Sequence, residues 1–255
     1  MSEPSLLRKM FMSTTSPVEQ RLFVEYGAIF ATRATPPPQI IFTDSSQVET
    51  FQSSLIVNRA VFGAHEIELQ AKAMSALIQA RDEITAIGGS LSARAADAGS
   101  RSYEDTLRLW KRNVEKGIEH WQELGRLTAA QAASIRELSP PQQVAAVLKL
   151  EDEEEFFFGT FFDKSILYSV ATPGASQHLS KLAFDVAEYE SKEVKMLLGQ
   201  HGWHRTVPND LPHFTYLGLT EEEMPECGLK RLERIYSAQV YDFWIPDLTS
   251  LSRAL

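Results

Sequence analysis

The sequence predicts an α+β protein: a small antiparallel sheet with flanking helices and a three-helix insertion. Two observations predict this class. The middle of the chain repeats apolar residues at three- and four-residue steps, as amphipathic helices do, whereas the second half holds short alternating aromatic and β-branched segments. Because no internal repeat or low-complexity linker divides the 255 residues, we expect one large domain with additions.

The composition argues against several classes of protein. Hydrophobic residues make up 44% and charged residues 23% of the chain, which is typical of a globular protein and not of a disordered one. A net charge of −9 without a cluster of Lys and Arg argues against a nucleic-acid partner. The lone Cys227 excludes an intramolecular disulfide and a multi-cysteine metal site.

The chain shows no pattern for membrane insertion or export. No apolar run approaches the ~20 residues that a bilayer span needs, so we expect no membrane span. The first twenty residues lack the apolar core of a secretory signal. Either the protein stays in the cytoplasm or a natural leader is missing, and the residues do not separate these alternatives.

The first 90 residues predict helices around one strand. Residues 17–33 read as a short helix that runs into an apolar segment, and residues 39–43 have the β-branched character of a strand. Ser45 or Ser46 is expected to cap a helix over residues 47–55. Residues 65–87 read as one helix that Gly88 and Gly89 end.

Three consecutive helices are expected after a short strand and turn at residues 90–102. The first covers residues 103–124, Thr128 caps the second, and Pro140 with Pro141 opens the third. The acidic run at residues 151–155 is expected to be a solvated helix end.

The last 90 residues predict strands and then helix. We expect a strand, a tight turn and a second strand over residues 166–189, a helix over 190–200, and a turn with a strand over 201–218. The tail from Thr220 is expected to be mainly helical. The chain then divides into an N-terminal extension packed on the core (1–65), a central domain with a helical insertion at about 103–160 (66–218) and a C-terminal helical tail (219–255).

Two histidine pairs look like metal motifs and fail. His65 is followed by Glu66 as in a zinc-protease helix, but the position of the second histidine ligand holds Leu69. His201 and His204 could share a face only in a helix, which Gly202 disfavours. For these residues we expect surface or packing roles.

His178, Asp185 and His213 form a more promising set. Asp185 lies in an alternating apolar segment, where burying a carboxylate is unfavourable unless a metal or a cation compensates its charge. Two imidazoles and one carboxylate are a suitable set of protein ligands for a catalytic Zn²⁺, with one position left open. The alternative is a pair of hydrogen-bonded core histidines and a solvated aspartate.

Three motifs in order resemble one known family. Ser176-Gln-His178, with Ala183 and Asp185 following, resembles the Ser-x-His-x6-Asp motif of the zinc D-alanyl-D-alanine carboxypeptidases and dipeptidases. This family includes vancomycin-resistance peptidases and phage L-alanyl-D-glutamate endolysins. DLPHFTYLG resembles its second motif, an acid three residues before the last zinc-binding histidine, and GSRSYEDT at 99–106 resembles its upstream arginine element. The resemblance implies the family's Hedgehog/DD-peptidase-like fold, with the sheet carrying the zinc.

The resemblance also implies roles for individual residues. His178, Asp185 and His213 would bind Zn²⁺, and Asp210 would act as general base and acid on the zinc-bound water. Arg101 and Ser176 would hold the substrate; without the resemblance, a salt bridge from Arg101 to Asp97 or Asp105 would be the expectation.

The implied activity is that of a zinc-dependent metallopeptidase of the D,D-carboxypeptidase type. Its substrates would be peptidoglycan stem peptides or D-Ala-D-Ala-type peptides, which places the protein in the periplasm or cell envelope. The alternatives are an endopeptidase of the L-Ala-D-Glu type, a catalytically inactive zinc-binding module, and a cytoplasmic enzyme that recycles wall fragments.

Some positions depart from the family pattern. Lys181 stands where the family usually has Gly, Thr106 replaces Gln, and Asp210 replaces the Glu of the carboxypeptidases, although the endolysin branch also uses Asp. The resemblance covers residues 99–218 and implies nothing for residues 1–65 or for the tail after Leu219.

Overall fold

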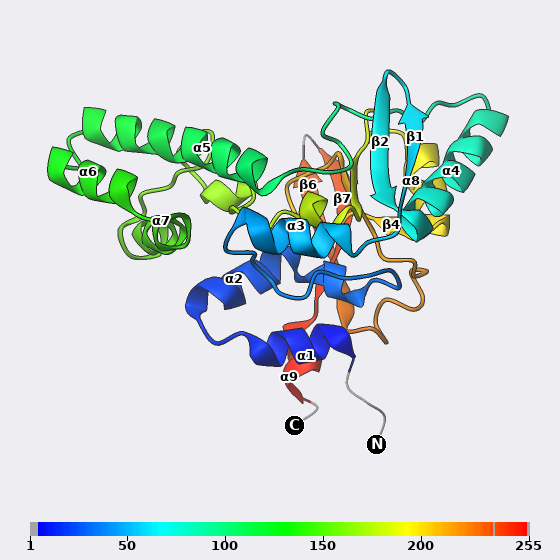
Figure 1. The fold of residues 1–255 in the computed structure, drawn as a ribbon, viewed down its shortest axis with the longest axis horizontal. Coiled ribbons are helices and arrows are strands. Elements are labelled where there is room, and N and C mark those ends of the chain that lie inside the picture. The colour runs from blue at the N-terminus through cyan, green and yellow to red at the C-terminus, as the bar shows by residue number, and fades with distance from the viewer. Residues whose placement is uncertain (1–4, 237, 254–255) are drawn as a thin grey trace. The chain divides into compact units, whose positions relative to one another are not determined.

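The protein is mixed helix and sheet, with small antiparallel sheets. The computed structural model describes residues 5–236 and 238–253. It divides into two compact units: a sheet unit of residues 1–40, 49–101 and 177–255, and a helical unit of residues 41–48 and 102–176. Figure 1 shows both units and labels their elements where there is room.

The helical unit confirms the three expected helices. They are α5 (Tyr103–Glu123), α6 (Ala129–Glu137) and α7 (Pro140–Glu154), and a short 3₁₀ helix, η2 (Ile166–Tyr168), follows. Ser102, Thr128 and Ser139 each begin a helix with a capping box, in which the side chain and the backbone of the first turn satisfy each other. The apolar stripe of α5 is buried as its periodicity predicts.

Glu151 corrects the expectation for the acidic run. Residues 152–155 are exposed, but Glu151 is only 2% exposed. Its carboxylate accepts hydrogen bonds from the Phe158 amide at 3.1 Å, the Ser165 hydroxyl at 2.6 Å and the Ile166 amide at 2.7 Å. Burial is tolerated because three donors replace water. This first residue of the run therefore closes the loop after α7.

The segment of residues 5–53 is mainly helical. It contains α1 (Leu6–Ser13), α2 (Pro17–Tyr26) and the 3₁₀ helix η1 (Gly27–Ala31). The helix α3 (Ser45–Ser53) begins two residues earlier than expected, because Asp44 Oδ1 accepts from the Gln47 amide at 2.9 Å and caps it. The strand expected at residues 39–43 is wrong: this described segment is irregular, and its Phe42 amide makes a single bond to the Gly174 carbonyl at 2.9 Å.

A hairpin replaces the first half of the helix expected at residues 65–87. The strands β1 (Val57–Phe62) and β2 (His65–Gln70) pair antiparallel, and α4 (Ala71–Ala86) follows directly. Residues 65–70 alternate, and Ile67 and Leu69 are buried, so their period of two outweighs the helical character of the adjoining α4 segment. Residues 90–102 contain one isolated bridge, Ala93 to Val186, instead of the expected strand.

The central sheet has the order β3-β5-β4 and carries the candidate site. Its strands are β3 (Ala183–Asp185), β5 (His213–Tyr216) and β4 (Trp203–His204), with the helix α8 (Lys192–Gln200) between β3 and β4 in sequence. The 3₁₀ helix η3 (Gln177–Ser180) precedes β3. Of the two strands expected over residues 166–189, the first is the 3₁₀ helix η2, and the second is confirmed as β3.

The tail corrects the expectation of a helical end. After turns at residues 221–228, the tail forms a long hairpin of β6 (Leu229–Tyr236) and β7 (Gln239–Pro246), followed by the short helix α9 (Leu248–Arg253). The segment QVYDFWIP is rich in aromatic and β-branched residues, which favour strands. In the described part of the chain, no helix combines the length and apolar character that a membrane crossing needs.

Candidate metal centre

Strand register brings two of the expected ligands face to face. Asp185 ends β3 and pairs directly with His213, the first residue of β5. His178 lies on η3, seven residues before Asp185, and the turn between them returns the chain to the sheet. His178 and His213 are 1% and 4% exposed, so the pair of rings is shielded from water.

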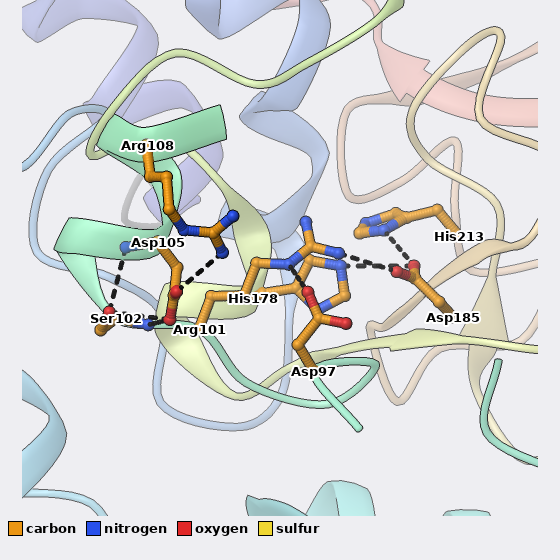
Figure 2. A network of polar contacts seen from close by, with 8 residues as sticks. All are labelled: Asp97, Arg101, Ser102, Asp105, Arg108, His178, Asp185 and His213. Atoms are coloured by element: carbon orange, nitrogen blue, oxygen red, sulfur yellow. Dashed lines mark hydrogen bonds and ion pairs between the residues drawn. The ribbon is translucent and has the colours of Figure 1, made fainter. Parts of the chain in front are cut away.

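Both imidazole rings face the same carboxylate oxygen of Asp185. His178 Nε2 lies 3.3 Å and His213 Nδ1 lies 3.1 Å from the same Asp185 Oδ1 (Figure 2). One ligand atom from each residue lies within 4.8 Å of the other two. Ligands of a tetrahedral zinc at ~2.0–2.2 Å are about 3.3–3.6 Å apart, so these spacings fit a metal ion after small adjustments.

Burial and the neighbouring groups together set the protonation states of His178 and Asp185. Burial lowers the pKa of His178 to about 4, although the nearby Asp185 charge raises it. For Asp185, burial alone raises the pKa, but the neighbouring imidazoles, His178 first, hold it well below its usual value. At neutral pH His178 is therefore neutral and Asp185 is ionised, which are their ligand forms. His178 Nδ1 is buried and has no hydrogen-bond partner in the described part of the chain.

Arg101 binds the other oxygen of Asp185. Its Nη2 lies 3.1 Å from Asp185 Oδ2, and its Nε lies 3.0 Å from Asp97 Oδ2 (Figure 2). The expected ion pair with Asp97 therefore exists, whereas Asp105 pairs with Arg108 at 3.1 Å. The sequence did not reveal the contact with Asp185. Because the guanidinium occupies Oδ2, it turns Oδ1 toward the two histidines.

Asp210 lies in the turn before β5. Its amide donates to the Val207 carbonyl at 3.2 Å and its carbonyl accepts from the His213 amide at 3.2 Å, so the backbone links Asp210 to His213. The residue is exposed, yet protein atoms crowd its surroundings. The resulting desolvation raises the pKa of its carboxyl, and the Asp185 charge adds to this, while His213 and Arg101 act in the opposite direction.

The other expected residues are placed less specifically. Ser176 is 7% exposed and is the last residue of the helical unit. His65 belongs to strand β2, His201 Nε2 lies 3.1 Å from Glu83, and His204 Nε2 lies 2.8 Å from the Leu219 carbonyl. These histidines have surface and packing roles, as expected, and none of them joins the cluster in the described structure.

Gln177 is a residue of this site that the sequence did not reveal. It lies between Ser176 and His178 in the first motif, and its side-chain oxygen is 2.9 Å from His213 Nε2. A glutamine beside a histidine has no distinctive pattern in one dimension, so only the folded structure identifies it.

Comparisons of the chain with protein-family models, with curated proteins and with solved structures found no match. A functional assignment therefore depends on the residues of the site themselves.

Proposed function

We propose that this protein is a zinc metallopeptidase that hydrolyses D-amino-acid-containing peptides of peptidoglycan, with carboxypeptidase action on D-Ala-D-Ala ends favoured. The observation that carries the proposal is the buried His178, Asp185 and His213 group, whose ligand atoms lie within 4.8 Å of one another. The order of the three sequence motifs supports the substrate class.

The donor set favours zinc. Two imidazole nitrogens and one carboxylate oxygen match catalytic zinc sites, which keep a further position open. A bound Zn²⁺ supplies a Lewis acid that polarises a peptide carbonyl and makes water acidic enough to react near neutral pH. The protein's own contribution is to keep His178 neutral and Asp185 ionised, and to place Asp185 opposite His213 on paired strands.

Asp210 and Arg101 are the candidates for the remaining roles. The raised pKa of Asp210 brings its proton exchange closer to neutral pH, which suits a group that takes a proton from water and returns it to the leaving amine. Arg101 would bind an anionic or carbonyl group of the substrate through its remaining donors, because a guanidinium presents several N–H groups in a fork.

The test combines metal analysis with hydrolysis of three substrates: D-Ala-D-Ala, a pentapeptide stem and intact sacculi. We expect one zinc per chain and release of D-alanine. Cleavage of stem peptides at L-Ala-D-Glu instead would assign the endopeptidase alternative. No metal uptake by the purified protein would refute the proposal.

Asp210→Asn separates chemistry from metal binding. The variant should keep its zinc and lose on the order of 10²–10⁴ in hydrolysis rate, as removal of a general base does. Asp82→Asn on the exposed face of α4 is the matched control and should change neither quantity. Loss of zinc together with activity would make Asp210 a ligand or a structural support, and full activity would place the base elsewhere.

One observation favours a second candidate, a zinc-binding module without catalysis. Arg101 is already engaged by two carboxylates, Asp97 and Asp185, so a substrate carboxylate would have to compete for its donors. Stoichiometric zinc without hydrolysis of any of the three substrates would select this candidate.

A further inference from the structure

Gln177 connects three parts of the sheet unit inside the core. Its side chain is buried on η3, where Nε2 donates to the Tyr26 carbonyl at 3.0 Å. Its Oε1 lies 2.9 Å from His213 Nε2 and also accepts from the hydroxyl of Thr215. The Thr206 hydroxyl lies 2.6 Å from Thr215 Oγ1, which extends the network.

The neighbours of Gln177 fix the orientation of its amide. A backbone carbonyl can only accept, so the group that faces the Tyr26 carbonyl must be the NH₂ of Gln177. The opposite orientation would place two oxygens 3.0 Å apart. Oε1 therefore faces His213, and it accepts from the imidazole, from the Thr215 hydroxyl and, at 3.2 Å, from the Thr206 hydroxyl.

This orientation determines which nitrogen of His213 carries hydrogen. Because Oε1 of Gln177 only accepts, Nε2 of His213 must be the donor across the 2.9 Å contact. In the neutral ring, the lone pair is then on Nδ1. That nitrogen lies 3.1 Å from Asp185 Oδ1, so two acceptors face each other across the cluster, an arrangement that a cation between them relieves.

We propose that Gln177 is a positioning residue that selects the Nε2–H tautomer of His213 and so presents Nδ1 to the metal. The inference rests on the proposed metal site but concerns a residue that contacts no metal itself. Hydrogen-bond partners of this kind orient ligating histidines and are worth roughly 10–100-fold in metal affinity.

Gln177→Leu is the main variant, and Gln143→Leu is its matched control. Gln143 is also buried, accepts from the ring N–H of Trp110 at 3.0 Å and donates to the Ile135 carbonyl at 2.9 Å, but it belongs to the helical unit. Gln143→Leu removes one ring contact and one backbone contact. Gln177→Leu removes the same two kinds of contact and also the acceptor of the Thr215 hydroxyl, so it should lose more unfolding free energy. Gln177→Glu keeps an acceptor toward His213 but turns a carboxylate oxygen toward the Tyr26 carbonyl, so it should lose unfolding free energy while it still accepts from His213.

Each variant is characterised by two measurements: zinc affinity by competition with a chelator, and the hydrogen on the His213 ring by nitrogen-resolved NMR with and without zinc. Wild-type protein should show Nε2–H. We expect Gln177→Leu to bind zinc about 10–100-fold more weakly and to lose the single Nε2–H form, while Gln143→Leu keeps wild-type affinity. Gln177→Glu should keep Nε2–H and recover the affinity, because a carboxylate partner makes the imidazole a stronger ligand.

Some results would overturn the inference. They are a hydrogen on Nδ1 of His213 in the wild type, unchanged zinc affinity in a folded Gln177→Leu, or an equal loss of affinity in Gln143→Leu. If Gln177→Leu does not fold, failure of Gln177→Glu to retain Nε2–H has the same force. Wild-type protein that shows Nε2–H but binds no zinc would refute the proposed function alone, and the tautomer selection by Gln177 would stand.

Discussion

Replacing Lys181 by glycine and by alanine tests the turn that carries His178. Lys181 has a φ of 55°, in the left-handed region where glycine is favoured, and it occupies the position where the resembled family usually has Gly. Its amide donates to the His178 carbonyl at 3.2 Å, and its carbonyl accepts from the Gln70 amide at 3.0 Å. The chain therefore adopts a glycine-like turn with a lysine in it.

Two opposing terms set the size of the effect. The left-handed conformation costs a non-glycine residue about 1–2 kcal/mol. Against this, the Lys181 ammonium pairs with Glu68, and the two side chains are 11% and 20% exposed. Glu68 also contacts Arg59 at 2.8 Å, so removing Lys181 does not leave its carboxylate unpaired. We estimate the loss of the pair at about 1–3 kcal/mol, between the values for surface and buried pairs.

Both variants lose the ion pair, and only glycine relieves the backbone. Glycine costs about 0.5–1 kcal/mol of stability because it is more flexible in the unfolded state, but it avoids the strain of about 1–2 kcal/mol that alanine keeps. Lys181→Gly should therefore be more stable than Lys181→Ala by about 1 kcal/mol. The assay is urea unfolding with a chelator present. Gln79, exposed on the helix α4 of the same unit, provides the control pair, in which alanine should exceed glycine by about 1 kcal/mol. Alanine equal to or better than glycine at position 181 would refute the reasoning.

Three further predictions concern other parts of the molecule. Glu151→Ala should lower the unfolding free energy by about 3–5 kcal/mol because three donors lose their acceptor, whereas Glu151→Gln should lose less than about 2 kcal/mol; equal losses in denaturant titrations would contradict this. Burial lowers the pKa of His204, so below about pH 6.5 the unfolded state binds more protons than the folded state. The stability that the neutral ring contributes is therefore complete above that pH and declines as the pH falls. With a chelator present, His204→Gln should therefore lose less unfolding free energy than wild type when the pH falls from about 7.5 to about 5.5. An equal loss in the two proteins would contradict a buried, neutral His204. Arg101→Ala should reduce turnover and weaken zinc binding roughly tenfold while leaving the fold intact, because the guanidinium also orients Asp185, and Arg101→Lys should rescue little; unchanged kinetics would return Arg101 to a purely structural role.

Local patterns predicted the three long helices of the helical unit well. The boundaries of α5, α6 and α7 follow from capping residues, prolines and an apolar stripe, all of which act within a few residues of chain. The strands were harder to predict. Residues 65–70 and 229–246 needed partner segments to become strands, and residues 39–43 had the composition of a strand but form none.

The sequence by itself determined the types of group at the candidate site. A carboxylate in an apolar strand segment and two histidines near turns indicated a buried charge that needs compensation, and the resemblance of the motifs singled out His178, Asp185 and His213. The same motif comparison showed that Lys181 stands where the resembled family usually has glycine, and the structure then showed a left-handed backbone at this residue.

Tertiary structure alone decided how these groups meet. The pairing of Asp185 with His213 depends on the register of β3 and β5, since a shift of one residue would turn one side chain to the opposite face of the sheet. Arg101 on Oδ2 of Asp185 and Gln177 on Nε2 of His213 join residues that are 84 and 36 positions apart. Such contacts leave no periodicity or spacing in the sequence, because they are fixed by the packing of distant segments and by which donor finds which acceptor in the buried core.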